Sequence, residues 1–159
     1  MLIVVWQNSD GSLRLTHPAI ACGENETEEA FCERIASHAL AADPELANCR
    51  RLANVRGDAI PARRWRDAWR AGADGAIVVD LAAARSLRKI ELTQAIQSEL
   101  STTRLRVVEA EEAGDVGAVA TFRQKAMLLR EIEQSLDGQL AGVSDLNLLS
   151  DWRPAALKR

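Results

Sequence analysis

The chain has 159 residues and a formal net charge of −3, and 47% of its residues are hydrophobic. This length suits one modest domain with an extension, and the small negative charge argues against a general affinity for nucleic acid and other polyanions. The apolar run at residues 2–6 has no basic segment before it, and no run approaches the roughly 20 apolar residues of a membrane span. We therefore expect neither a signal peptide nor a membrane-bound protein.

Residues 1–79 predict a small α+β head that opens with a β-hairpin. Residues 2–6 are apolar and β-branched, and residues 12–17 alternate between polar and apolar side chains, so both segments indicate strands. The Asp10-Gly11 pair between them is a strong turn signal. Together these features predict two antiparallel strands joined by a tight turn.

A helix and two short strands complete the predicted head. Asn25 is the expected N-cap of the helix, with Glu28 as its capping-box partner. The expected inner face of this helix consists of Phe31, Ile35 and Ala39. Residues 51–55 and 76–80 are the expected strands, and the second of these leads into a long helical segment.

Residues 63–70 combine arginine and tryptophan at high density. Trp65 and Trp69 are four residues apart, so on one helical turn they share a face. The interpretation that we favour is that this pair anchors a short helix to the sheet, with the arginines solvated or paired with acidic residues. A protein-docking patch is one alternative, because Trp and Arg are common interface anchors. Nucleic-acid binding through phosphate contacts and base stacking is the other.

Residues 80–140 predict a long antiparallel helical hairpin. Residues 81–112 contain neither Pro nor Gly and are rich in good helix formers, with Asp80 as the expected N-cap. Gly114 suits a left-handed turn position, and Asp115 suits the next N-cap. The apolar stripe of the first helix consists of Leu92, Ile96, Leu100, Val107 and Ala110, with Thr103 in the gap.

The second helix carries a regular stripe that we call the seam. Its members alternate between spacings of three and four residues and are Val119, Phe122, Ala126, Leu129, Glu133, Leu136 and Leu140. Because both helices exceed the mean length of about 12 residues, we expect part of the seam to face another protein or other copies of the chain, giving a homo-oligomer. A hairpin packed on its own domain is the alternative. Glu133 could set the register of a partner or lie at a wet edge. Gly138 should end or bend the helix, and residues 141–159 follow as a tail with a short capped turn.

Residue types that carry catalysis or bind metals are sparse. Cys22, Cys32 and Cys49 lack metal-ligand spacing, so we expect free buried thiols. The chain has two His and lacks the phosphate-binding, serine-hydrolase and zinc-protease motifs. We therefore expect no enzyme activity, no metal site and no cofactor.

Two stretches of the head are similar to motifs of one group of small proteins. The first is the strand-turn-strand of residues 1–18, which ends in His17-Pro18. The second is residues 60–69, which read IPARRWRDAW and are similar to the motif P-x-x-R-x-F-R-x-A-W. Trp65 stands where that motif has Phe.

Two further stretches follow in the same order. Residues 77–85 are similar to a strand that runs into D-M-x-K-A-R, although Leu81 and Ala83 depart from its Met and Lys. Residues 112–130 are similar to A-G-D followed by K-Q-x-L-R. The four stretches keep their order and spacing between residues 1 and 137, and the match as a whole covers most of that range.

With these motifs, the chain resembles small proteins encoded near the tail and tail-fibre genes of tailed bacteriophages and prophages, often labelled tail-assembly-chaperone-like. The resemblance implies a non-catalytic virion structural or tail-fibre assembly protein. Its partners would be phage tail or tail-fibre proteins, and its location the virion tail or, during assembly, the host cytoplasm. A transient fibre-assembly chaperone absent from the mature particle is one alternative, and a nucleic-acid-binding regulator is another.

Two groups of side chains are the expected protein contacts. They are Trp65, Arg66 and Trp69 on the head and Phe122, Leu129 and Leu136 on the hairpin. Polar replacements of Leu129 and Leu136 should lower the oligomer mass or abolish partner binding. If neither changes, the seam is internal to the chain.

Overall fold

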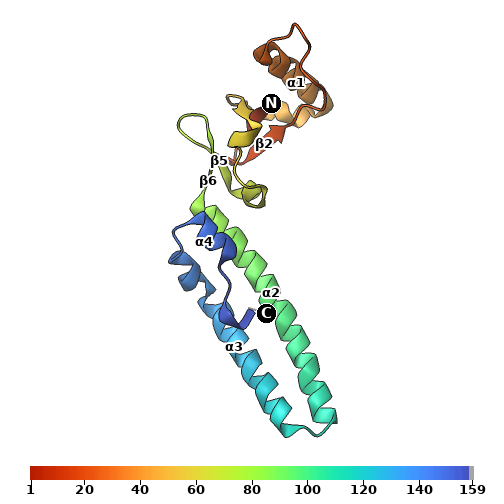
Figure 1. The fold of residues 1–159 in the computed structure, drawn as a ribbon, viewed down its shortest axis with the longest axis vertical. Helices are drawn as coiled ribbons and strands as arrows, with labels where there is room; N and C mark the ends of the chain where they lie inside the picture. Colours follow the sequence, from red (N-terminus) through yellow and green to blue (C-terminus); the bar gives the residue numbers. More distant parts are fainter. Residues whose placement is uncertain (158–159) are drawn as a thin grey trace. The chain divides into compact units, whose positions relative to one another are not determined.

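The computed structural model describes residues 1–157, and the chain forms two compact units, Met1–Ala83 and Ala84–Arg159. We call the first the head and the second the hairpin unit. Figure 1 shows short strands and a helix in the head and two long helices in the hairpin unit. The expected α+β class, a small head followed by a helical hairpin, is confirmed.

A single apolar strand organises the head sheet. β1 (Leu2–Gln7) pairs antiparallel with β2 (Leu13–Thr16), which confirms the predicted β-hairpin. The four residues from Ile3 to Trp6 are each 1–2% exposed, so both faces of β1 are covered. Burial on both faces accounts for an apolar run that does not alternate with polar residues.

The strand expected at residues 51–55 is instead two short strands, β3 (Arg50–Arg51) and β4 (Val55–Arg56), which both pair antiparallel with β1. The register of β3 on β1 differs by one residue from that of β4, so residues 52–54 hold one extra residue. An extra residue of this kind is a β-bulge, which bends the strand and interrupts its pairing. A separate two-stranded sheet consists of β5 (Trp69–Ala71) and β6 (Ile77–Val79).

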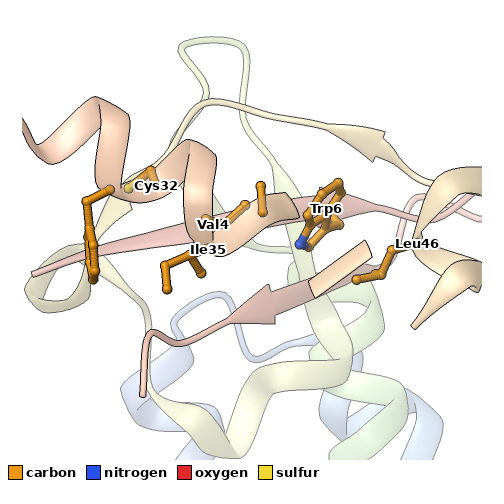
Figure 2. Close-up of a cluster of buried hydrophobic side chains, with 7 residues drawn as sticks. Val4, Trp6, Cys32, Ile35 and Leu46 are labelled. Atoms are coloured by element: carbon orange, nitrogen blue, oxygen red, sulfur yellow. The ribbon is translucent and has the colours of Figure 1, made fainter. Parts of the chain in front are cut away.

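The helix α1 (Glu28–Ala42) packs against β1 and β2 and closes the main core of the head. Figure 2 shows this core, which consists of Val4, Trp6, Phe31, Cys32, Ile35, Ala36 and Leu46. Of the expected inner face of the helix, Phe31 and Ile35 are buried and Ala39 is half-buried. The predicted face is therefore correct at its centre.

The predicted N-cap of α1, Asn25 with its capping box, is wrong. The helix begins after Thr27, whose Oγ1 accepts a main-chain N–H of the first turn at 3.2 Å. The Glu26 carboxylate accounts for the difference, because it accepts the Gly23 N–H at 3.1 Å and forms a two-point ion pair with Arg34 at 2.9 and 2.7 Å. These contacts hold the preceding loop in a turn, so the helix starts later than the capping pattern predicts.

The Glu26–Arg34 pair should make the stability of the head depend on pH. Hydrogen bonds from Arg34 and then from the Gly23 N–H lower the pKa of Glu26 from 4.5 to about 2. A depressed folded-state pKa stabilises the fold above the unfolded-state pKa of 4.5, and this contribution is lost as the pH falls through about 2. Over that window, the urea midpoint of the wild type should fall more steeply than that of Glu26→Gln. The neighbouring Glu24→Gln variant should keep the wild-type slope, and parallel profiles for wild type and Glu26→Gln would contradict the expectation.

The predicted start of the helical hairpin and the position of its turn are confirmed. α2 (Leu81–Glu112) begins after Asp80, whose Oδ1 accepts a main-chain N–H of the first turn at 2.8 Å. Gly114 has a φ of +70° in the turn, and Asp115 caps α3 (Val116–Ala141) by accepting a main-chain N–H at 2.9 Å. Local sequence signals therefore fix both ends of the turn.

Ion pairs show that the two helices run antiparallel. Lys89 near the start of α2 lies 2.6 Å from Asp137 near the end of α3, and Glu111 near the end of α2 lies 2.6 Å from Arg123 near the start of α3. The buried residues between the helices include Leu92, Ile96, Leu100, Ala126, Leu129, Leu136 and Leu140. Glu133, the polar member of the seam, accepts a hydrogen bond from α2 at 2.6 Å on the exposed edge of this core.

The C-terminal tail belongs to the hairpin unit. The short helix α4 (Leu146–Asp151) begins after Asp145, whose Oδ1 accepts two main-chain N–H groups. This is the capped turn expected in the tail. Leu149 is 0% exposed and Trp152 is half-buried, so the tail packs against the hairpin.

Two arginines of α2 hold the tail by its main chain. Arg85 donates two hydrogen bonds to the Val143 carbonyl, at 2.7 and 3.0 Å. Arg88 donates to the Trp152 carbonyl at 2.8 Å and to Glu91 at 2.6 Å. Arg88 is only 5% exposed, so its charge lies inside the hairpin unit.

Alanine substitutions at two glycines of the hairpin should change the free energy of unfolding in opposite directions. Gly114 has a φ of +70°, which L side chains rarely adopt, so Gly114→Ala should lower the free energy of unfolding by about 1 kcal/mol. Gly138 lies inside α3, so the expectation that the helix ends there is wrong. Described atoms leave open space around a Cβ at Gly138, so Gly138→Ala should raise this free energy by about 0.5–1 kcal/mol. Urea unfolding followed by circular dichroism measures both, and a loss of stability in both variants would contradict the assignment.

Candidate interaction surface

The predicted contact residues fall into two environments. The buried ones, with at most 4% exposure, are Trp65, Trp69, Leu129 and Leu136. Arg66 is exposed and Phe122 is half-buried. The seam residues Leu129 and Leu136 are thus packed within the hairpin unit, and contact with a partner in this conformation must use side chains other than these buried ones.

The two tryptophans do not share a helical turn as expected. Arg63–Ala68 forms a short 3₁₀ segment that bends at Trp65, and Trp69 begins β5 opposite Val79. Both rings nevertheless enter the head core, so they anchor this segment as predicted. A platform for base stacking needs an exposed aromatic face. Neither ring provides one, which weakens the nucleic-acid alternative.

A hollow on the head joins segments that lie far apart in the sequence. It has a volume of about 730 Å³ and is lined by Ile3 of β1, Leu15 of β2, His17 and residues 57–69 in part. The antiparallel pairing of β2 and β4 with β1 brings these segments together, and the Gly57 N–H donates to the Met1 carbonyl at 3.0 Å. We call this feature the head hollow.

Positive charge and apolar surface lie side by side in the head hollow. Arg63 and Arg66 carry the positive charge and are exposed, His17 is exposed beside them, and none of the described residues that line the hollow is acidic. Leu15 and Ile60 are half-buried and form part of an apolar wall. The hollow therefore suits a ligand with both a negative and an aliphatic group.

Trp69 adds a hydrogen-bond donor to this environment. It lines the head hollow and is 4% exposed, and its Nε1 has no hydrogen-bond partner within residues 1–157. The buried Trp6 contrasts with it, because its Nε1 donates to the Thr16 Oγ1 at 2.9 Å. An unpaired buried donor lowers stability by roughly 1–3 kcal/mol. The Nε1 atom is itself buried, so a ligand acceptor reaches it, and recovers part of that free energy, only when the hollow opens on binding.

A second groove lies on the hairpin unit and has a volume of about 940 Å³. It is lined by α2, by Lys125 of α3 and by the tail. Four of its charged side chains form two ion pairs: Lys125 Nζ lies 2.5 Å from Glu99, and Arg88 Nη1 lies 2.6 Å from Glu91. Arg106 and Arg153 also line it. Because this groove contains two carboxylates and the described lining of the head hollow contains none, the head hollow is the better candidate for binding an anionic ligand.

The described residues include no group of three or more His, Cys, Asp or Glu that could hold a metal ion. None of the helices in the described part of the chain is long and apolar enough to cross a membrane. The three cysteines are free thiols. Cys32 is buried as expected, whereas Cys22 is exposed and Cys49 is half-buried.

Two of the predicted contact residues, Arg66 and Trp69, line the head hollow, but the sequence patterns did not indicate its other lining residues. Arg63 lies three residues before Arg66, and this spacing is a signal for a shared surface on a helical segment. His17 carries no such signal, because only the pairing of β1 and β2 places it beside the arginines. The hollow as a whole is therefore a product of the tertiary fold.

Comparisons with known proteins leave the family of the chain open. No protein-family model, no curated protein and no solved structure matches it. The functional assignment therefore rests on the sequence motifs and on the geometry of the head hollow.

Proposed function

We propose that the chain is a non-enzymatic tailed-bacteriophage structural or tail-fibre assembly protein that acts through protein–protein contacts. The observation that best supports this proposal is that residues 1–18 and 60–69, which carry the head motifs of the resemblance, both contribute to the head hollow. Exposed arginines beside an apolar wall are typical of protein contact sites. Because both motifs contribute to one site, a single binding function accounts for both of them.

The hairpin unit supports the proposal as a stiff spacer. α2 has 32 residues, which corresponds to a length of roughly 48 Å at about 1.5 Å per residue. Exposed apolar side chains of the hairpin unit include Leu105 and Val108 of α2 and Met127 of α3, which are 60%, 49% and 59% exposed. Single apolar side chains of this kind are ordinary on protein surfaces. We therefore place the primary contact with a tail or tail-fibre protein on the head and treat homo-oligomerisation as secondary.

The test uses the phage or prophage that carries the gene. In-frame deletion should give particles with missing or misassembled tails or fibres in electron micrographs, and a plasmid copy of the wild-type gene should restore them. Quantitative mass spectrometry of purified particles then separates two forms of the proposal. A fixed copy number per particle identifies a virion component, whereas abundance in the lysate and absence from particles identifies a transient chaperone. Unchanged titre and tail morphology after deletion would contradict the proposal.

A further inference from the structure

We propose that the head hollow binds an acidic peptide segment of a partner protein, one that presents a carboxylate next to an aliphatic side chain. This inference rests on the proposed role in protein–protein contacts and specifies the chemistry of the partner. Three features of the hollow carry it: unpaired arginines, an apolar wall and an unpaired indole N–H.

The arginines of the head hollow differ from four other arginines of the head. Carboxylates of the head pair within 3.2 Å with Arg14, Arg34, Arg51 and Arg56. The side chains of Arg63 and Arg66 form no ion pair or hydrogen bond with described residues, and no described carboxylate lines the hollow. Their guanidinium groups are therefore available for two-point hydrogen bonds to a carboxylate.

The apolar wall decides between classes of anionic ligand. Ile3, Leu15 and Ile60 line the same hollow as the arginines, and its volume of about 730 Å³ lies in the range of ligand sites. A nucleic-acid backbone brings phosphates but no aliphatic group for this wall, and its bases find no open face on Trp65 or Trp69. A peptide with alternating acidic and aliphatic side chains satisfies both the charge and the wall.

The Trp69 indole N–H distinguishes a binding role from a purely structural one. Trp69→Phe removes this donor and keeps an aromatic ring in the core. If Trp69 is only a core residue, the variant should bind the peptide as the wild type does, since the lost N–H has no described partner. If the N–H donates to the bound carboxylate, the variant should bind several-fold more weakly.

The test is a nuclear magnetic resonance titration of the full chain labelled with ¹⁵N. The chain has four Trp, so four indole N–H signals are expected, and the Trp69→Phe spectrum identifies the signal of Trp69. The probes are a capped pentapeptide of alternating leucine and glutamate, its leucine–glutamine counterpart, and a single-stranded oligothymidine. The glutamate peptide should change the chemical shift of the Trp69 indole signal. It should not change that of Trp6, because the Trp6 N–H already donates a hydrogen bond. This method detects binding as weak as about 1 mM, a free energy near −4 kcal/mol.

Matched variants locate the binding. Arg63→Gln and Arg66→Gln should each weaken binding of the glutamate peptide by about tenfold, because each removes a charge-assisted contact. Arg64→Gln removes the same charge from the same segment but not from the hollow, because Arg64 lies over the Trp65 ring at 4.9 Å. It should change binding less than about twofold, which is a free-energy change of about 0.4 kcal/mol. An unchanged Trp6 signal in each variant verifies the fold.

Several results would overturn the inference. The first is a Trp69 indole signal whose chemical shift does not change at millimolar glutamate peptide. The second and third are equal affinity for the glutamine peptide and an equal loss of affinity in all three arginine variants. The others are wild-type affinity of Trp69→Phe and binding of oligothymidine alone. Any of these leaves the role in phage assembly standing, because that role is tested by gene deletion and particle composition. If gene deletion has no effect but the chain binds the glutamate peptide, the chain is an acidic-peptide-binding protein that acts outside phage assembly.

Discussion

Replacing Leu129 by alanine is expected to lower the free energy of unfolding of the hairpin unit by about 2–5 kcal/mol. Leu129 is 0% exposed in the core between α2 and α3. The substitution removes buried apolar atoms, and the surrounding side chains close the resulting cavity only in part. Urea unfolding followed by the helical circular dichroism signal measures the change.

Leu128→Ala is the matched control for this substitution. It deletes the same atoms from the adjacent residue of the same helix, but Leu128 is 47% exposed. Its effect should stay within about 0.5 kcal/mol, as is usual for surface positions. If Leu129→Ala lowered the mass of an oligomer without destabilising the fold, the seam would be an intermolecular interface after all. The structure favours the internal packing, since Leu136 and Leu140 of the same seam are also 0–2% exposed.

The hairpin could be predicted closely because local chemistry determines it. Residues 81–112 contain no Pro or Gly, Asp80 and Asp115 have side chains that accept orphan N–H groups, and Gly114 tolerates a positive φ. These signals act within a few residues of each helix end. The sequence pattern could not decide whether the seam packs on the next helix or on another chain, because a heptad stripe is the same in both cases.

The head was predicted less closely because its details depend on contacts distant in sequence. The bulge between β3 and β4 exists only in relation to β1, and the start of α1 depends on the ion pair of Glu26 with Arg34. The position of Trp69 at the start of β5 depends likewise on its pairing with β6. A spacing of four residues suggested a shared helical turn for the tryptophans, but strand pairing overrides local periodicity here.

One signal in α2 was present in the sequence and could have been used. Arg88 lies four residues before Leu92, so it continues the apolar stripe of the first helix towards Asp80. A charged residue on such a stripe is buried when it finds hydrogen-bond acceptors. The structure supplies them as the Trp152 carbonyl and the Glu91 carboxylate.

Replacing Arg88 by alanine is therefore expected to loosen the C-terminal tail and to destabilise the hairpin unit by about 2–4 kcal/mol. Arg88 is 5% exposed, and its loss leaves the Trp152 carbonyl without this charged donor and a void where the stem lay. Hydrogen exchange should accelerate at the amides of α4. Lys89→Ala, the neighbouring control, removes a basic side chain that is 43% exposed and paired with Asp137. It should change stability by less than about 1 kcal/mol.

Arg88→Met separates the two causes of this effect. Methionine retains an apolar stem of similar shape but donates no hydrogen bond to the Trp152 carbonyl. It also removes a buried guanidinium whose Nε has no partner among residues 1–157, and this removal favours the folded state. If the tail exchanges rapidly in Arg88→Met while global stability recovers, the hydrogen bond holds the tail and the stem supports the core. If both tail protection and stability return to wild-type values, packing alone fixes the tail, and the contact with the Trp152 carbonyl is incidental.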